Sequence, residues 1–188
     1  AASVSAAYGT LVYLVSVAGG WLADRILGSY RAVLWGGVLI ACGHYCMAVP
    51  TSAMTWVGLG LISAGTGLLK PNAATMVGKL YRTDDERRDA GFAVYYMAIN
   101  IGAFAGPLVT GWLGDHGGWH WGFSAAALGM TLGIAQYLLG RRHLAGRRQA
   151  AASALAPDAL RRAVRRIVAG AVTVAVVATA LALAGWLT

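Results

Sequence analysis

Long apolar stretches alternate with short polar segments along the whole chain. Six stretches are long and apolar enough to cross a bilayer as helices, which takes about 20 mostly apolar residues. They cover residues 4–23, 32–49, 53–78, 91–113, 121–139 and 164–187. Glycine is frequent inside them, as is typical of membrane helices, because small residues let two backbones approach closely. The pattern predicts an all-α membrane protein.

The composition agrees with this prediction. Apolar residues make up 58% of the chain and charged residues 12%, against about 45–50% and about 25% in soluble proteins. The formal net charge of +8 raises the question of a nucleic-acid partner. Such a partner requires cations gathered on one accessible face, so their distribution along the chain decides the question.

All but one of the 15 Lys and Arg residues lie in alternate connections between the predicted spans or within the first residues of the span that follows. The first connection has Arg25 and Arg31, the third has Lys79, Arg82, Arg87 and Arg88, and the fifth has eight arginines between positions 141 and 166. The intervening connections, near 50–53 and 114–120, have none. The positive-inside rule then predicts a multi-pass inner-membrane protein with cytoplasmic basic loops, and no nucleic-acid partner.

The remaining cation, Lys70, lies inside the third predicted span, in GTGLLKPNAA. It is nine residues from Lys79, or about 13 Å along a helix, and therefore near the middle of the membrane. A charge at that depth costs about 2.5–3.5 kcal/mol on insertion scales, so it needs compensation. The expected role is a ligand or coupling-ion site. The alternative is a structural ion pair with a carboxylate on another helix.

The neighbours of Lys70 support a position inside protein or beside water. Its helical face carries small or weakly polar residues, namely Gly60, Ser63, Gly67 and Ala74. Pro71 follows directly and removes a backbone donor, which can open or kink the helix. A freed carbonyl at membrane depth is tolerated only beside protein or water.

A second unusual stretch is GGWLADRILGSYR, residues 19–31. Asp24 lies at the C-terminal end of a predicted helix, where the helix dipole disfavours an anion by up to about 1 kcal/mol. Together with Arg25 and Arg31 it is expected to form a conformational latch with another helix. An ordinary capped turn is the alternative.

A third stretch, FAVYYMAINIGAFAGP (residues 92–107), places polar groups at membrane depth. Tyr96 and Asn100 are four residues apart and share a helical face, where both need partners. Asn100 is either a ligand-binding residue or an interhelical hydrogen-bonding residue. Tyr13 lies on the small-residue face of the first span and also needs a partner.

No pattern typical of a soluble enzyme or a metal site accompanies these residues. The stretch around Lys70 lacks the Gly-Lys-Ser/Thr order of a phosphate loop, and there is no G-x-S-x-G. His116 and His120 are four apart but lack a third ligand. Cys42 and Cys46 are interpreted as packing residues. The sequence therefore predicts neither an enzyme nor a bound cofactor or metal.

Taken together, the three stretches resemble the proton-dependent oligopeptide transporter (POT/PTR) family of the major facilitator superfamily. Residues 19–31 are similar to the superfamily's motif between helices 2 and 3 and to the family's first signature. Residues 92–104 are similar to its second signature, on helix 5, with GTGLLKPN between the two. The resemblance covers about residues 7–144 and implies helices 2 to 6 in 1–140. A basic cytoplasmic linker would follow in 141–162, and an additional helix between the two six-helix halves in 163–188.

The resemblance also implies a function, which is inward transport of di- and tripeptides with protons as the coupling ion. Lys70 resembles the helix 4 lysine associated with the peptide carboxylate and with proton coupling. Tyr13 resembles the helix 2 tyrosine that faces the peptide, and Asn100 the helix 5 asparagine that hydrogen-bonds it. The family's helix 1 motif, Glu-x-x-Glu-Arg, and the second half are absent from the sequence.

The chain is accordingly expected to be a fragment. Its expected partners are small peptides, membrane lipids, and helix 1 and the C-terminal half of the parent protein. Two alternatives remain open. One is a major facilitator for another anionic solute such as nitrate, and the other is a non-transporting membrane scaffold in which Lys70 only forms an ion pair.

Overall fold

The structure is a computed structural model that describes residues 15–140 and the isolated positions 158, 162 and 165. The chain divides into two units, Ala1–Ala152 and Ser153–Thr188, and residues 15–140 belong to the first. Tyr13 lies outside the described residues, as do most of the predicted linker 141–162 and most of the predicted helix 163–188.

The described part of the first unit is built from helices joined by short connections. Residues 15–22 form an α-helix, called here the first described helix, which passes into a π-helical turn, η1 (Ala23–Leu27). Four long α-helices follow. They are α2 (Ser29–Ala48), α3 (Ser52–Lys79), α4 (Arg87–Gly117) and α5 (Trp119–Leu139).

Each of the four long helices is long and apolar enough to cross a membrane, as the hydropathy pattern predicts. The main difference lies between α4 and α5, where the sequence predicts a loop over 114–120. The two helices are instead separated by Gly118 alone. Its φ of 93° is accessible to glycine without steric cost, so the chain reverses in one residue and both helices extend further than expected.

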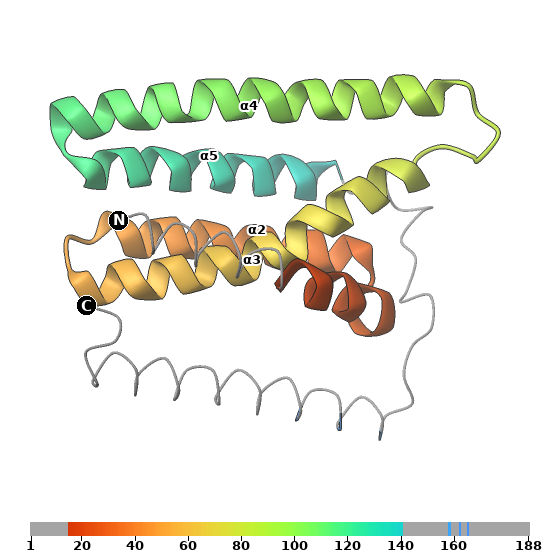
Figure 1. Ribbon diagram of the computed structural model, residues 1–188, viewed down its shortest axis with the longest axis horizontal. Helices are drawn as coiled ribbons and strands as arrows, with labels where there is room; N and C mark the ends of the chain where they lie inside the picture. The colour runs from red at the N-terminus through yellow and green to blue at the C-terminus, as the bar shows by residue number, and fades with distance from the viewer. Residues whose placement is uncertain (1–14, 141–157, 159–161, 163–164, 166–188) are drawn as a thin grey trace. The chain divides into compact units, whose positions relative to one another are not determined.

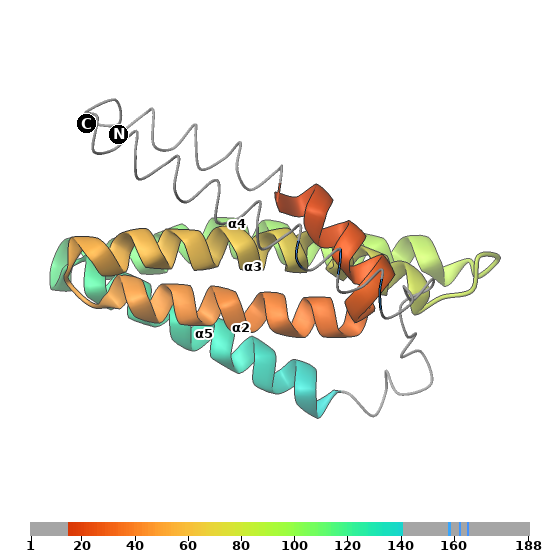
Figure 2. The same cartoon turned by 90° about the horizontal axis from the view of Figure 1, so that it is seen from below.

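The helices pack side by side in an order that differs from their order in the sequence. α2 lies between α3 and α5, and α4 lies along α5 (Figure 1). Figure 2 shows the same arrangement from below, with α2 again beside both α3 and α5. The contact between α3 and α4 is small and includes Gly78 against the ring of Phe92.

Glycine allows α2 and α3 to approach each other at backbone distance. A Cβ built on Gly65 would lie 2.6 Å from the Gly36 carbonyl oxygen, and one built on Gly36 would lie 2.7 Å from the Gly65 carbonyl oxygen. About two helical turns further along the contact, Gly43 and Gly58 face each other in the same way. The core between these helices therefore combines closely packed glycines with a few larger side chains, Ile40 of α2 and Ile62 of α3.

Polar contacts join the ends of the helices that carry the basic loops. The Tyr137 hydroxyl of α5 donates to the Tyr30 carbonyl of α2 at 3.2 Å and lies 3.0 Å from the sulfur of Met76 in α3. The Lys79 Nζ, in the last turn of α3, donates to the Ser29 Oγ at 3.0 Å. Lys79 thus connects α3 to the start of α2, and Tyr137 connects α5 to both α2 and α3.

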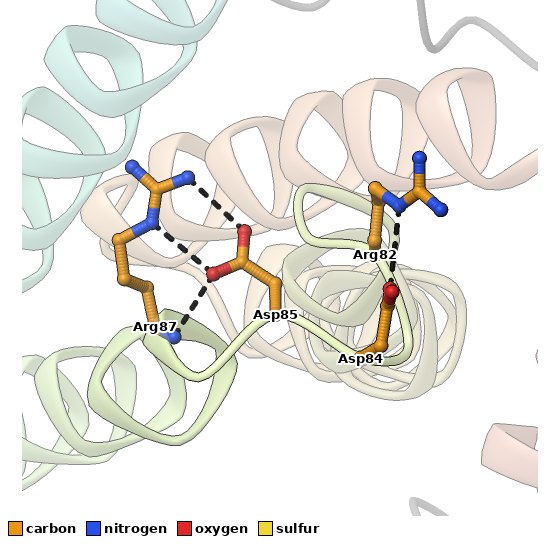
Figure 3. A network of polar contacts seen from close by, with 4 residues as sticks. All are labelled: Arg82, Asp84, Asp85 and Arg87. Carbon is orange, nitrogen blue, oxygen red and sulfur yellow. Dashed lines mark hydrogen bonds and ion pairs between the residues drawn. The ribbon is translucent and has the colours of Figure 1, made fainter.

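The connection between α3 and α4 holds two Arg–Asp pairs (Figure 3). The Asp85 carboxylate accepts from the Arg87 backbone N–H at 3.0 Å and from its guanidinium at 3.1 and 3.2 Å. Asp85 thus satisfies a backbone donor at the start of α4, which is the role of an N-terminal cap. Arg82 and Asp84 form a separate, exposed pair at 3.2 Å.

Candidate functional site

Lys70 lies in the second half of α3, directly before Pro71. α3 stays helical through Pro71, and Figure 1 shows the helix changing direction along its length. Because proline has no N–H, the Gly67 carbonyl lacks the donor that a regular helix supplies four residues later. The cation is therefore placed beside an interruption in the backbone hydrogen bonds.

The Lys70 side chain is exposed on the surface of the described helices. Its neighbour Leu69 faces α2, because the Leu69 backbone nitrogen lies 2.8 Å from a Cβ built on Gly36. Successive helical residues are about 100° apart around the axis. The Lys70 side chain therefore projects from α3 to one side of the contact between α2 and α3, not into that contact.

The small-residue face predicted around Lys70 is only partly covered by the described helices. Ser63 is 3% exposed and Gly67 is buried, the latter packed on Val15 of the first described helix. Gly60 and Lys70 are exposed, and a Cβ built on Gly60 would meet no atom within 4 Å. One edge of the face is thus closed by the first described helix, and the edge that carries Lys70 is open.

Asn72 is a polar residue of this region that the sequence reasoning missed. It is 2% exposed, and its Nδ2 donates to the Leu68 carbonyl at 2.7 Å and to the Gly19 carbonyl at 3.4 Å. The signal was present in the sequence. An amide in the middle of an apolar span needs partners for the same reason that Lys70 and Asn100 do.

Asn100 lies on α4, a helix whose most apolar stretch has no buried residue in the described structure. Its side chain is exposed, and its Nδ2 donates to the Tyr96 carbonyl at 2.9 Å. A carboxamide has two N–H donors and an acceptor oxygen, so this bond leaves capacity for a ligand. Gly102 and Gly106, spaced for close packing, have no atom within 4 Å of an added Cβ.

Asp24 and Arg25 lie in η1, and Arg31 lies in the first turn of α2. All three side chains are exposed, and none forms an ion pair or hydrogen bond with the residues that the structure describes. The sequence did not predict the π-helical geometry at Asp24, where the Gly28 N–H reaches the Ala23 carbonyl at 2.8 Å. Such turns are frequent at functional sites.

The predicted site residues are therefore distributed over separate helices. Lys70 is on α3, Asn100 is on α4, and the latch residues surround the turn between the first described helix and α2. Tyr13 lies outside the described residues. Within residues 15–140 no group of three or more His, Cys, Asp or Glu side chains is placed to hold a metal ion.

Comparison with known proteins identifies close relatives in sequence. A family model described as the POT family matches residues 30–179. A di-/tripeptide transporter of Lactococcus lactis subsp. lactis is 46% identical over 145 residues, which cover 76% of this chain and 29% of that protein. An uncharacterized transporter of Bacillus subtilis (strain 168) is 46% identical over 143 residues, again 76% of this chain and 29% of the relative. The chain thus spans less than a third of the length of both.

Solved structures give the same result. A peptide transporter POT in complex with sulfate has a TM-score of 0.86 and 44% identity, covering 96% of this chain and 37% of that chain. A POT family transporter in complex with 5-aminolevulinic acid has a TM-score of 0.85 and 38% identity, covering 93% and 36%. These matches confirm the predicted fold, an all-helical membrane protein with part of a transporter's helices.

Proposed function

Because this chain belongs to the POT family of transporters, we propose that it forms part of a proton-coupled symporter that moves di- and tripeptides inward by alternating access. The carrying observation is the 46% identity to a di-/tripeptide transporter over most of the chain, a stretch that includes a cation within the apolar α3. Alternating access requires two halves that rock about a central site. The partners are therefore helix 1 and the C-terminal half of the parent protein, together with membrane lipids.

Lys70 is the centre of the proposed mechanism. An ammonium at membrane depth is stabilised by a negative partner, and the terminal carboxylate of a peptide is one such partner. A carboxyl side chain is the other when no peptide is bound. When the peptide carboxylate pairs with the ammonium, the side-chain carboxyl loses its positive neighbour and binds a proton more readily. Competition for one cation thus couples peptide binding to proton binding.

The other predicted residues have supporting roles in this proposal. Asn100 hydrogen-bonds the peptide from α4, where one bond to Tyr96 leaves capacity on its amide. Tyr13 faces the peptide from its own helix. Asp24, Arg25 and Arg31 form a latch that is closed in only one conformation of the cycle. Protons are the coupling ion and no cofactor is needed.

The proposed orientation places the basic connections in the cytoplasm, with the protein in the inner membrane. The residues concerned are Arg25, Arg31 and Lys79, and the arginines between α3 and α4. The positive-inside rule supports this orientation. Basic segments beside a membrane also attract anionic lipid headgroups, which supports lipids as partners of the arginine-rich stretch 141–166.

Replacing Lys70 with Gln in the full-length protein tests the proposal. The neutral side chain keeps much of the lysine's length but cannot pair with a carboxylate. We expect proton-driven dipeptide uptake to be lost while the amount of folded, monodisperse protein in detergent is unchanged. Lys79→Gln is the matched control, because it removes the other lysine of α3 at a position where the structure shows a hydrogen bond to Ser29.

The test variant and its control separate the proposal from its rivals. If Lys70→Gln prevents folding while Lys79→Gln does not, Lys70 is structural and the scaffold interpretation is favoured. If Lys70→Gln retains full proton-driven uptake, the coupling role is refuted.

A transporter for other anionic solutes is the second candidate, since a 38% identical relative is solved with 5-aminolevulinic acid. Competition of unlabelled nitrate or 5-aminolevulinic acid against a labelled dipeptide distinguishes these substrates.

A further inference from the structure

The backbone hydrogen bonding of α3 is interrupted at Pro71, one residue beyond Lys70. A second helix, the first described helix, packs against α3 at this point. The Gly67 carbonyl lacks the N–H that a regular helix supplies four residues later, because Pro71 has no N–H. A Cβ built on Gly19 of the first described helix would overlap this oxygen, so the Gly19 Cα lies directly against it. Such Cα–H···O contacts stabilise closely packed helices weakly. Only glycine fits at this position.

Asn72 adds a short hydrogen bond within α3 and a longer one across the junction to the first described helix. Its Nδ2 group has two hydrogens, and the structure places one acceptor on each helix, the Leu68 carbonyl at 2.7 Å and the Gly19 carbonyl at 3.4 Å. The side chain is 2% exposed and is the largest fully buried side chain among the described residues. A buried amide loses its bonds to water, so these two carbonyls compensate it.

We propose that Asn72 is a positioning residue for Lys70. Where the helical hydrogen bond is missing, α3 is able to bend at the turn that carries Lys70. The Asn72 carboxamide holds this turn against the first described helix. The orientation of the Lys70 side chain therefore depends on a second helix. The same bonds make α3 and the first described helix move together at the turn that contains Asn72. The inference rests on the proposed role of Lys70 in peptide binding and proton coupling.

Two substitutions of Asn72 in the full-length protein separate its two bonds. Asn72→Leu has nearly the same size and donates neither bond. Asn72→Ser has a single hydroxyl hydrogen, which reaches only one carbonyl, and the nearby one is the Leu68 carbonyl on the same helix. For Asn72→Leu we expect the KM for a dipeptide to rise about tenfold, equivalent to about 1.4 kcal/mol. For Asn72→Ser we expect a smaller rise.

A measurement of the pH profile distinguishes positioning from simple stabilisation. A residue that only stabilises the fold lowers the amount of folded transporter and leaves KM and the pH profile of the folded fraction unchanged. A residue that positions Lys70 changes how the ammonium meets its carboxylate partners. We therefore expect the pH midpoint of uptake to shift in both Asn72 variants, measured per folded transporter after size-exclusion chromatography.

Thr75→Val is the matched control. The Thr75 hydroxyl donates to the Pro71 carbonyl at 3.0 Å, so it is also a side-chain bond to the backbone of this turn. It does not reach a second helix, and the residue is exposed. We expect Thr75→Val to leave KM and the pH profile unchanged. An equal effect of Thr75→Val and Asn72→Ser would show that the bond between helices has no special role.

A double substitution tests the link to the backbone interruption. Pro71→Ala restores an N–H that can bond the Gly67 carbonyl, which makes the turn less dependent on Asn72. We expect Asn72→Ser to raise KM less in the Pro71→Ala background than in the wild type. Additive effects would overturn the inference.

The outcomes separate failure of this inference from failure of the proposed function. If Lys70→Gln abolishes proton-driven uptake but both Asn72 variants have wild-type KM and pH profiles, only the positioning role is refuted. If Lys70→Gln is without effect, the proposed function of Lys70 fails whatever the Asn72 variants do. Should Asn72→Leu not fold, Asn72→Ser decides, since it keeps a donor for the buried site.

Discussion

Replacing Gly65 with Ala tests the backbone contact between α2 and α3. A Cβ at this position would lie 2.6 Å from the Gly36 carbonyl oxygen and 2.7 Å and 2.9 Å from the Cγ1 and backbone nitrogen of Ile40. Ordinary contact begins near 3.4 Å. The helices would have to separate locally by at least 3.4 − 2.6 = 0.8 Å, because two of the three atoms belong to the backbone of α2 and cannot rotate away.

Two opposing effects set the size of the change. Inserting one methyl group into a well-packed contact costs about 1–3 kcal/mol. Alanine is favoured over glycine in a helix by about 1 kcal/mol. Gly60→Ala carries only the second effect, because Gly60 is in the same helix, is exposed and has no atom within 4 Å of an added Cβ. The difference between the two variants therefore isolates the packing cost.

The assay is thermal unfolding of the purified full-length protein in detergent. We expect Gly65→Ala to unfold at a lower temperature than Gly60→Ala, with a difference in unfolding free energy of about 1–3 kcal/mol. Gly60→Ala itself should be neutral or slightly stabilising. Equal unfolding temperatures for the two variants would refute the close approach of α2 and α3 at Gly65.

The remaining predictions concern polar contacts in and near the loops. Asp85→Ala should lower the free energy of unfolding by about 1 kcal/mol, because it removes the cap at the start of α4 as well as the pair with Arg87. Asp84→Ala, which breaks an exposed pair, should change it by less than about 1 kcal/mol in urea titrations, and a larger loss for Asp84→Ala would contradict the assignment. Tyr137→Phe should lower stability by about 0.5–1.5 kcal/mol, because the hydroxyl bonds the neighbouring helix at a partly buried position. Tyr45→Phe, which loses only an exposed hydroxyl contact, should have a smaller effect in the same thermal assay, and the reverse order would be evidence against the junction at Tyr137.

Several features of the protein were determined by the sequence alone. Hydropathy and length predict the helices that became α2 to α5, because a membrane-spanning helix satisfies its own backbone hydrogen bonds and must be apolar outside. The motifs around Asp24, Lys70 and Asn100 identify the family without any coordinates. These properties are local, since each depends on a short run of residues and on the solvent that surrounds it.

The sequence was less informative about ends and turns. It predicts a loop over 114–120, whereas the structure turns at Gly118 alone. Trp119 and Trp121 are compatible with a loop or with a helix at a membrane interface, so side-chain character does not fix the boundary. The boundary between α4 and α5 is set by the glycine that adopts a positive φ, and several glycines in this region are able to adopt that conformation.

The tertiary structure alone decided which small and polar residues meet. Among the many glycines, it selects Gly36 with Gly65 and Gly19 with Gly67 as positions of backbone contact. It gives Asn72 its partner on a helix 53 residues away in sequence. Periodicity shows that a residue lies on a particular face of its helix but carries no information about the neighbour across that face. The neighbour is set by how helices of similar apolar character pack together, which is a property of the whole chain.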